Sequence, residues 1–215
     1  MSQRHFPVGR FPTDRVAEGP RPSCLRRIAE PDVALAIWRR AAPRGLAEWL
    51  DDLPADRLPD GRFAAASTDI VPALEALCTA GGLPDCTFRR RLIADIATVA
   101  ALYGRVAGRE RLQVRLEALD HDSCWRFHRD HVGLRLNVTY RGPTTQWPAL
   151  DQEARALRAQ RRYRGPISEL PRFAVGLFKG VPLIGERAIL HRSPPVSGSG
   201  ITRLFLCIDG ESDDD

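Results

Sequence analysis

The stretch CWRFHRDHVGLRLNVTYRGPTTQW, residues 124–147, carries the two signals on which our interpretation of the fold rests. In GLRLNVTY, residues 133–140, polar and apolar side chains alternate with a period of two, which is typical of a half-buried β-strand. The segment His128-Arg129-Asp130 lies just before it, where another strand-like run, CWRFH, reaches a turn. The stretch therefore predicts β-structure with an H-x-D at a strand end.

Further strand-like runs lie on both sides of this stretch. Leu112, Val114 and Leu116 alternate with polar residues, which again indicates a strand with one buried face. The remaining runs are RFAVGLFKG (172–180), AILH (188–191) and TRLFLCIDG (202–210). The second half of the chain thus predicts an antiparallel sheet system.

The first half instead shows apolar residues at helical spacing. We expect helices over 33–38, where Pro31 and Asp32 precede an apolar run, and over 46–53. A third should run from Thr68 or Asp69 to the Gly81-Gly82 stop, and a fourth from near Asp85 to Gly104. Helices first and strands afterwards indicate an α+β protein.

This pattern divides the chain into segments. We expect an irregular arm over 1–25, a helical N-terminal layer over 26–110, a β-rich metal-binding core over 111–210 with a basic helical insert at 150–165, and an acidic tail over 211–215. The insert is interpreted either as a solvated helix or as a lid over an anionic or macromolecular substrate.

The composition of the chain excludes several classes of protein. The chain has 215 residues, 43% of them hydrophobic, and no apolar window long enough for a transmembrane helix. No signal-peptide pattern is visible, so we expect a cytoplasmic protein. Five scattered cysteines without a C-x-x-C pair exclude a disulfide scaffold and a four-cysteine zinc ribbon. The net charge of +5 is spread along the chain, so nucleic-acid binding has no support beyond general basicity, and the oligomeric state stays open.

The polar residues of the β-rich half suggest a metal site. Residues i and i+2 of a strand share a face, so His128 and Asp130 can present a nitrogen and an oxygen to one ion. His191, at the end of a later strand-like run, supplies a third ligand. Two histidines and a carboxylate with open positions form the facial triad of non-haem Fe(II) oxygenases. Arg203, near the start of the last predicted strand, can bind a carboxylate of a dicarboxylic co-substrate.

The order H-x-D, distant His, then Arg resembles the iron(II)- and 2-oxoglutarate-dependent dioxygenases, an enzyme family built on a double-stranded β-helix, or jelly roll, related to cupins. The strings CWRFHRDHVGLRLNVTYRGPTTQW, GLFKG and HRSPP also resemble an uncharacterised bacterial family of unknown function associated with zinc-homeostasis genes. The first resemblance implies Fe(II) on His128, Asp130 and His191, and 2-oxoglutarate on Arg203. It further implies a small jelly roll whose two missing strands come from 61–67 and 144–147, and an oxygenase that hydroxylates a small molecule or peptide.

Three more residues are candidates for cofactor binding. Lys179 is the only lysine in the chain, and a compact amine suits a small anion site. Arg135 and Tyr140 follow the H-x-D on the alternating run. The alternative interpretation is that each of these three is an ordinary solvent-exposed or core residue with no role in binding.

Other metal chemistries stay open. A local zinc set would consist of His121, Cys124, His128 and His131, although 121 and 128 face opposite sides of one extended strand. Cys124 is otherwise expected to be a small buried hydrophobic residue. The alternative function is a non-catalytic zinc-binding or metal-homeostasis protein that uses the same triad; a third is a cupin-like hydrolase or isomerase.

Overall fold

Residues 15–210 are described by the structure, a computed structural model. Its strands are β1 (Val16–Gly19), β2 (Leu35–Trp38), β3 (Gly61–Ala66), β4 (Arg111–Leu119), β5 (Leu134–Arg141), β6 (Gln146–Pro148), β7 (Ile167–Glu169), β8 (Val175–Lys179) and β9 (Arg203–Gly210). The α-helices are α1 (Leu46–Asp52), α2 (Ile70–Ala80), α3 (Thr87–Ala107), α4 (Glu153–Ala159) and α5 (Val181–Ile184). The protein is therefore a mixed α and β structure, as the sequence predicts.

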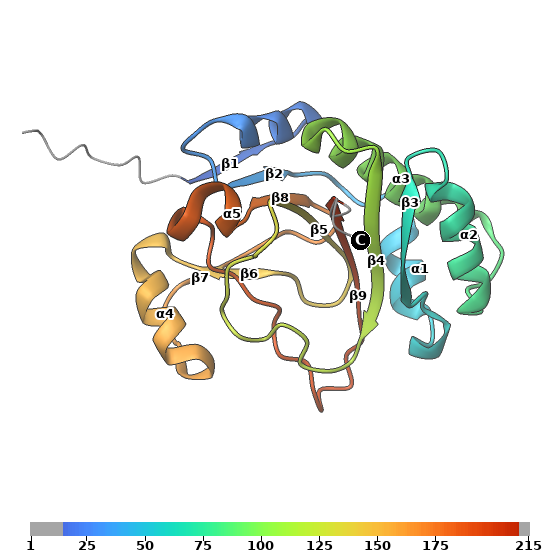
Figure 1. Cartoon of the computed structure of the whole chain (residues 1–215). Helices are drawn as coiled ribbons and strands as arrows, with labels where there is room; N and C mark the ends of the chain where they lie inside the picture. The colour runs from blue at the N-terminus through green and yellow to red at the C-terminus, as the bar shows by residue number, and fades with distance from the viewer. Residues whose placement is uncertain (1–14, 211–215) are drawn as a thin grey trace, which may run out of the picture.

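Seven of these strands form one large sheet in the order β1-β2-β8-β5-β9-β4-β3. Strand β1 runs parallel to β2, whereas the other neighbours are antiparallel. Strands β6 and β7 form a separate antiparallel pair. Figure 1 shows α1, α2 and α3 gathered beside β3 and β4, with α4 on the opposite side of the molecule near β6 and β7.

The two faces of the large sheet differ because side chains alternate along each strand. On one face, β4, β5 and β9 pack apolar residues against α1, α2 and α3 in the main core. On strand β5 these residues are Leu136, Val138 and Tyr140. The opposite face of the same strand carries Arg135 and Asn137, which line a cavity. The alternation seen in the sequence thus separates the core from the site.

The first half of the chain differs from the expected helical layer. Residues 33–38 were expected to be helical, but Leu35–Trp38 is strand β2, which lies between β1 and β8. Leu35, Ala36 and Ile37 are buried on both faces of the sheet, so the run is continuously apolar and has no period of two. The expected helical layer over 26–110 is therefore interrupted by β2, and it also contains β3, which corresponds to the strand proposed at 61–67.

Part of the predicted arm is also regular structure. Strand β1 lies at the sheet edge, and Pro22–Ala29 is a 3₁₀ helix that buries Leu25 and Ile28. The rest of that arm, residues 1–14, and the acidic tail at 211–215 lie outside the described residues.

Other expectations are confirmed or refined. Helices α1, α2 and α3 lie where the spacing predicts them, although α3 continues past Gly104 and ends before Gly108, whose φ is +64°. The two additional strands proposed at 61–67 and 144–147 correspond to β3 and β6. Within residues 15–210, no helix has both the length and the apolar character needed to cross a bilayer.

Candidate metal centre

The backbones of His128 and His191 pair directly, which brings together two positions 63 residues apart in the sequence. The N–H of each residue donates to the carbonyl of the other at 2.9 Å, as an isolated antiparallel bridge. The two imidazole rings lie side by side with centroids 4.7 Å apart. The runs 124–128 and 188–191 were expected to be full strands, but they form only this bridge.

Each imidazole has one nitrogen held by the backbone. Nδ1 of His128 lies 2.8 Å from the Arg126 carbonyl, and Nδ1 of His191 lies 3.0 Å from the Ile189 carbonyl. A carbonyl only accepts, so each Nδ1 carries the proton and each Nε2 keeps a free lone pair. Metal-binding histidines are oriented by this kind of bond.

Burial favours the neutral form of His191. Its side chain is 6% exposed, and its ring lies against the Phe178 ring at a centroid distance of 4.9 Å. Burial lowers the pKa of His191, although the nearby Asp130 carboxylate acts in the opposite direction. A neutral imidazole is the form that ligates a metal.

Asp130 completes the group with an unpartnered carboxylate oxygen. Its Oδ1 accepts a hydrogen bond from Nη1 of Arg135, whereas its buried Oδ2 has no hydrogen-bond partner. Oδ2 lies 3.5 Å from Nε2 of His191. One ligand atom from each of His128, Asp130 and His191 lies within 4.8 Å of the others, which small side-chain shifts would adapt to metal bonds of about 2.1 Å. The three residues fit a divalent metal ion.

His128, Asp130 and His191 line a cavity of about 110 Å³. The other side chains that line it come from the polar face of the large sheet and from neighbouring loops: Arg115, Glu117, Leu119, Ser123, Cys124, Arg135, Asn137, Thr145, Arg192, Ser193, Phe205 and Cys207. Thr145, which directly precedes β6, is one of them. The site is therefore a pocket between the sheet and its loops.

Arg203 lies at the start of β9 on the cavity-facing side of that strand. It is only 1% exposed, its Nε donates to the Pro143 carbonyl at 2.7 Å, and its Nη2 has no partner. Its guanidinium carbon lies 5.2 Å from the ring centroid of Phe205, which lines the cavity. Burial lowers the pKa of Arg203 to about 10. Among the described residues it forms no ion pair, which is unusual for a buried cation.

The unpartnered buried side-chain atoms of the described chain all belong to this region. They are Asp130 Oδ2, Asn137 Oδ1, Thr139 Oγ1 and Arg203 Nη2. Buried polar atoms without partners are rare in folded proteins and ask for an explanation. Asn137 and Thr139 were not among the selected site residues, although the alternation of β5 places them on the same face as Arg135.

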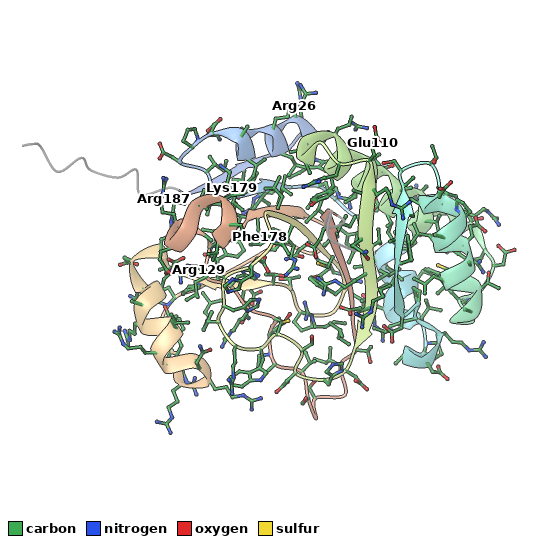
Figure 2. The ribbon with its side chains drawn as sticks, in the orientation of Figure 1. Arg26, Glu110, Arg129, Phe178, Lys179 and Arg187 are labelled. Atoms are coloured by element: carbon green, nitrogen blue, oxygen red, sulfur yellow. The ribbon has the colours of Figure 1, made fainter. Side chains whose placement is uncertain are left out.

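Lys179 does not reach the cavity, contrary to expectation. Its Nζ donates to the Glu30 carbonyl at 2.8 Å. On β8 it shares a face with Val175 and Leu177, which belong to the main core, whereas Phe178 points to the other side and packs on His191. Figure 2 shows Lys179 near Arg187, at the α5 end of β8. Placement of Lys179 as a cofactor-binding residue is therefore wrong.

Tyr140 also lies on the core side and not in the cavity. It is fully buried, and its hydroxyl donates to Oδ2 of Asp95 on α3 at 2.7 Å, beside the Arg40–Asp95 ion pair. Burial raises the pKa of Tyr140, so it remains a hydrogen-bond donor. The even-numbered residues of β5 face the helices, and this parity excludes Tyr140 from cofactor binding.

The Tyr140→Phe variant tests this correction. Loss of one buried hydrogen bond should reduce the free energy of unfolding by about 1 kcal/mol, measured by urea denaturation. Affinity for a divalent metal ion should stay within twofold of the parent. A loss of metal affinity without loss of stability would return Tyr140 to the candidate site.

The local zinc set is not assembled in the structure. His121 is exposed beside Asp120, and His131 lines a different cavity with Tyr103 and Leu183. Cys124 is exposed, with a φ of +49°, and is not the buried residue that we expected. In the described part of the chain, His128, Asp130 and His191 form the one group of three or more residues of metal-ligating type.

The basic insert packs against the segment that carries His128. It consists of short 3₁₀ turns around α4, whose Arg155 and Arg158 are exposed. On its inner side, Gln160 accepts a hydrogen bond from the Phe127 backbone at 2.8 Å, and Tyr163 packs edge-on against the Phe127 ring. The arginines of α4 are solvent-exposed, as the interpretation of the insert as a solvated helix predicts. The inner side of the insert also packs against the segment that carries His128.

Comparison with solved structures returns distant likenesses. A Pseudomonas putida prolyl-4-hydroxylase aligns with a TM-score of 0.35 and 15% identity, over 81% of this chain and 99% of that one. A full-length Neurospora crassa protein in complex with alpha-KG gives 0.38 and 9%, over 83% and 74%. The non-heme alpha ketoglutarate dependent carbocyclase SnoK from nogalamycin biosynthesis gives 0.37 and 9%, over 86% and 82%. Likenesses of this size establish neither a fold nor an activity for this chain.

Sequence comparison gives a family. No curated protein matches the chain. The profile of a family described as "Protein of unknown function (DUF1826)" matches residues 19–209, which is most of the chain and includes every residue of the metal centre. The chain therefore belongs to the DUF1826 family.

Proposed function

We propose that this protein is an Fe(II)- and 2-oxoglutarate-dependent oxygenase. The observation that carries the proposal is that Asp130, whose buried Oδ2 has no partner, lines one cavity together with His128 and His191. The unpartnered Nη2 belongs to Arg203 on β9, two residues before the cavity-lining Phe205. A metal ion would satisfy the carboxylate oxygen, and an anionic co-substrate would satisfy the guanidinium.

The donor set suits iron(II). His128, Asp130 and His191 would hold the ion through two imidazole Nε2 atoms and one carboxylate oxygen, the combination used by non-haem Fe(II) oxygenases. Bound there, iron would supply the activation of dioxygen that the side chains of the protein cannot provide. The large sheet, together with the separate β6–β7 pair, would be the jelly roll that this enzyme class uses.

The side chains of the chain would bind and orient the reactants. The Arg126 and Ile189 carbonyls fix both imidazole rings. Arg203 would bind the distal carboxylate of 2-oxoglutarate through its unpartnered Nη2, and the unpartnered hydroxyl of Thr139, which lies opposite Phe205, would be a second donor. Burial strengthens such a charged pair, because the guanidinium has little water to give up. The substrate would be a small molecule or peptide that reaches the cavity mouth, hydroxylated in the cytoplasm.

An anaerobic titration tests this proposal. Fe(II) followed by 2-oxoglutarate should produce a weak visible charge-transfer absorption band, because an α-keto acid would chelate the metal held by His128, Asp130 and His191. Succinate, which lacks the keto group, is the control and should give no band. Tight metal binding without any response to 2-oxoglutarate would instead support a non-catalytic zinc-binding or metal-homeostasis protein.

A further inference from the structure

Arg135 lies between two carboxylates and bonds to both. Its Nη1 donates to Oδ1 of Asp130, while Nε and Nη2 donate to Oδ1 and Oδ2 of Asp209, each at 2.8 Å. Arg135 and Asp209 are cross-strand partners on β5 and β9, so the sheet itself sets their separation. Each of the three guanidinium nitrogens thus already donates to a carboxylate of the protein, which does not favour the expected role of Arg135 in binding a co-substrate carboxylate.

A second arginine completes the group. Arg115 on β4 contacts Oδ2 of Asp209 at 3.2 Å and Sγ of Cys207 at 2.9 Å. The two carboxylates of Asp130 and Asp209 are therefore balanced by two guanidinium groups. Burial acts to lower the pKa of Arg135, but the paired Asp209 carboxylate helps to raise it overall, so Arg135 stays charged.

We propose that Arg135 is a positioning residue that restricts Asp130 to a single metal-ligating oxygen. This inference rests on the metal site of the proposed function. Oδ1 of Asp130 is occupied by Arg135, so Oδ2 alone is available to the ion. Arg135 thereby preserves the open positions that a co-substrate needs.

The proposal predicts opposite effects for two variants. In Arg135→Gln, a positive charge beside the site is lost and Asp130 is free to use both oxygens, so affinity for a divalent metal should rise about tenfold. In Asp209→Asn, the charge of Arg135 is no longer balanced, so the affinity should fall about tenfold. A merely structural role would weaken metal binding in both variants.

The experiment measures Co(II) affinity and the visible absorption spectrum of the Co(II) complex in the full-length chain. Arg135→Gln should bind more tightly and change the spectrum, because the carboxylate ligation changes. Arg135→Lys, which keeps the charge, should have the parent affinity. The control variant is Arg155→Gln, which removes an exposed charge outside the cavity lining and should match the parent in both readouts. Thermal unfolding of each apo-protein shows that it is folded before titration.

The outcomes distinguish failure of the proposed metal site from failure of the proposed role of Arg135. A parent protein that binds no Co(II) would overturn the proposed metal site together with this inference. A parent that binds Co(II), with affinity lowered or unchanged in Arg135→Gln, would overturn the role of Arg135 alone. Should Arg135→Gln fail to fold, an Asp209→Asn variant with undiminished Co(II) affinity would overturn it equally.

Discussion

The His191→Ala variant should bind Fe(II) at least roughly 100-fold more weakly than the parent, because one of three protein ligands is removed and even outer-shell losses cost 10- to 100-fold. The Nε2 of His191 lies 3.5 Å from Oδ2 of Asp130, and no other imidazole among the described residues can replace it. Isothermal titration under anaerobic conditions measures the effect.

His121→Ala is the matched control. It removes an imidazole that belongs to the local zinc set, yet the structure places it at the surface beside Asp120. Its metal affinity should equal that of the parent. If His121→Ala lost the metal and His191→Ala kept it, the metal centre would have to be moved to the loop at 121–131.

The Arg203→Met variant should become more stable while it loses the co-substrate. Methionine fills a similar volume without the buried, unpaired charge, and an uncompensated buried charge destabilises the folded state. Since burial has lowered the pKa of Arg203 to about 10, charging it in the folded state is unfavourable, and this cost disappears in the variant at neutral pH. A gain of about 1 kcal/mol would raise Tm by about 2–4 °C.

The affinity for 2-oxoglutarate should fall in the same variant by roughly 10- to 100-fold, the range expected for losing a charged hydrogen-bond pair. Fe(II) affinity should change little, because Arg203 is not a ligand. Arg203→Lys, which keeps the charge, should show an intermediate 2-oxoglutarate affinity. Unchanged 2-oxoglutarate binding in Arg203→Met would locate the anchor elsewhere and remove the co-substrate role from Arg203.

Only part of the candidate metal centre could be predicted from a local pattern. His128 and Asp130 are two residues apart, so their proximity is visible in the sequence, whereas His191 was selected from the resemblance and is brought to them by a backbone bridge across 63 residues. The alternation of β5 also predicts its two faces. Tyr140 illustrates the limit: it was selected as a site residue although its parity places it with Leu136 and Val138 in the core.

Other features depend on long-range pairing that no local pattern contains. Strand β2 is buried on both faces because Ala36 packs in the main core, whereas Leu35 and Ile37 pack in a second apolar cluster on the other face. Its sequence therefore cannot be distinguished from that of a short helix. Lys179 binds the Glu30 carbonyl, 149 residues earlier in the sequence. That Asn137 and Thr139 lack partners is likewise visible only when every neighbour is in place.

The backbone bridge between His128 and His191 has a consequence for the apo-protein. Because the two N–H···O bonds already close a loop of 63 residues, the imidazoles are brought together by the peptide chain and not by an ion. Metal binding should therefore proceed on a preorganised scaffold, with little gain in secondary structure. Unlike a zinc finger, which is unfolded without its ion, the protein should survive chelators as a folded molecule and take up metal again reversibly.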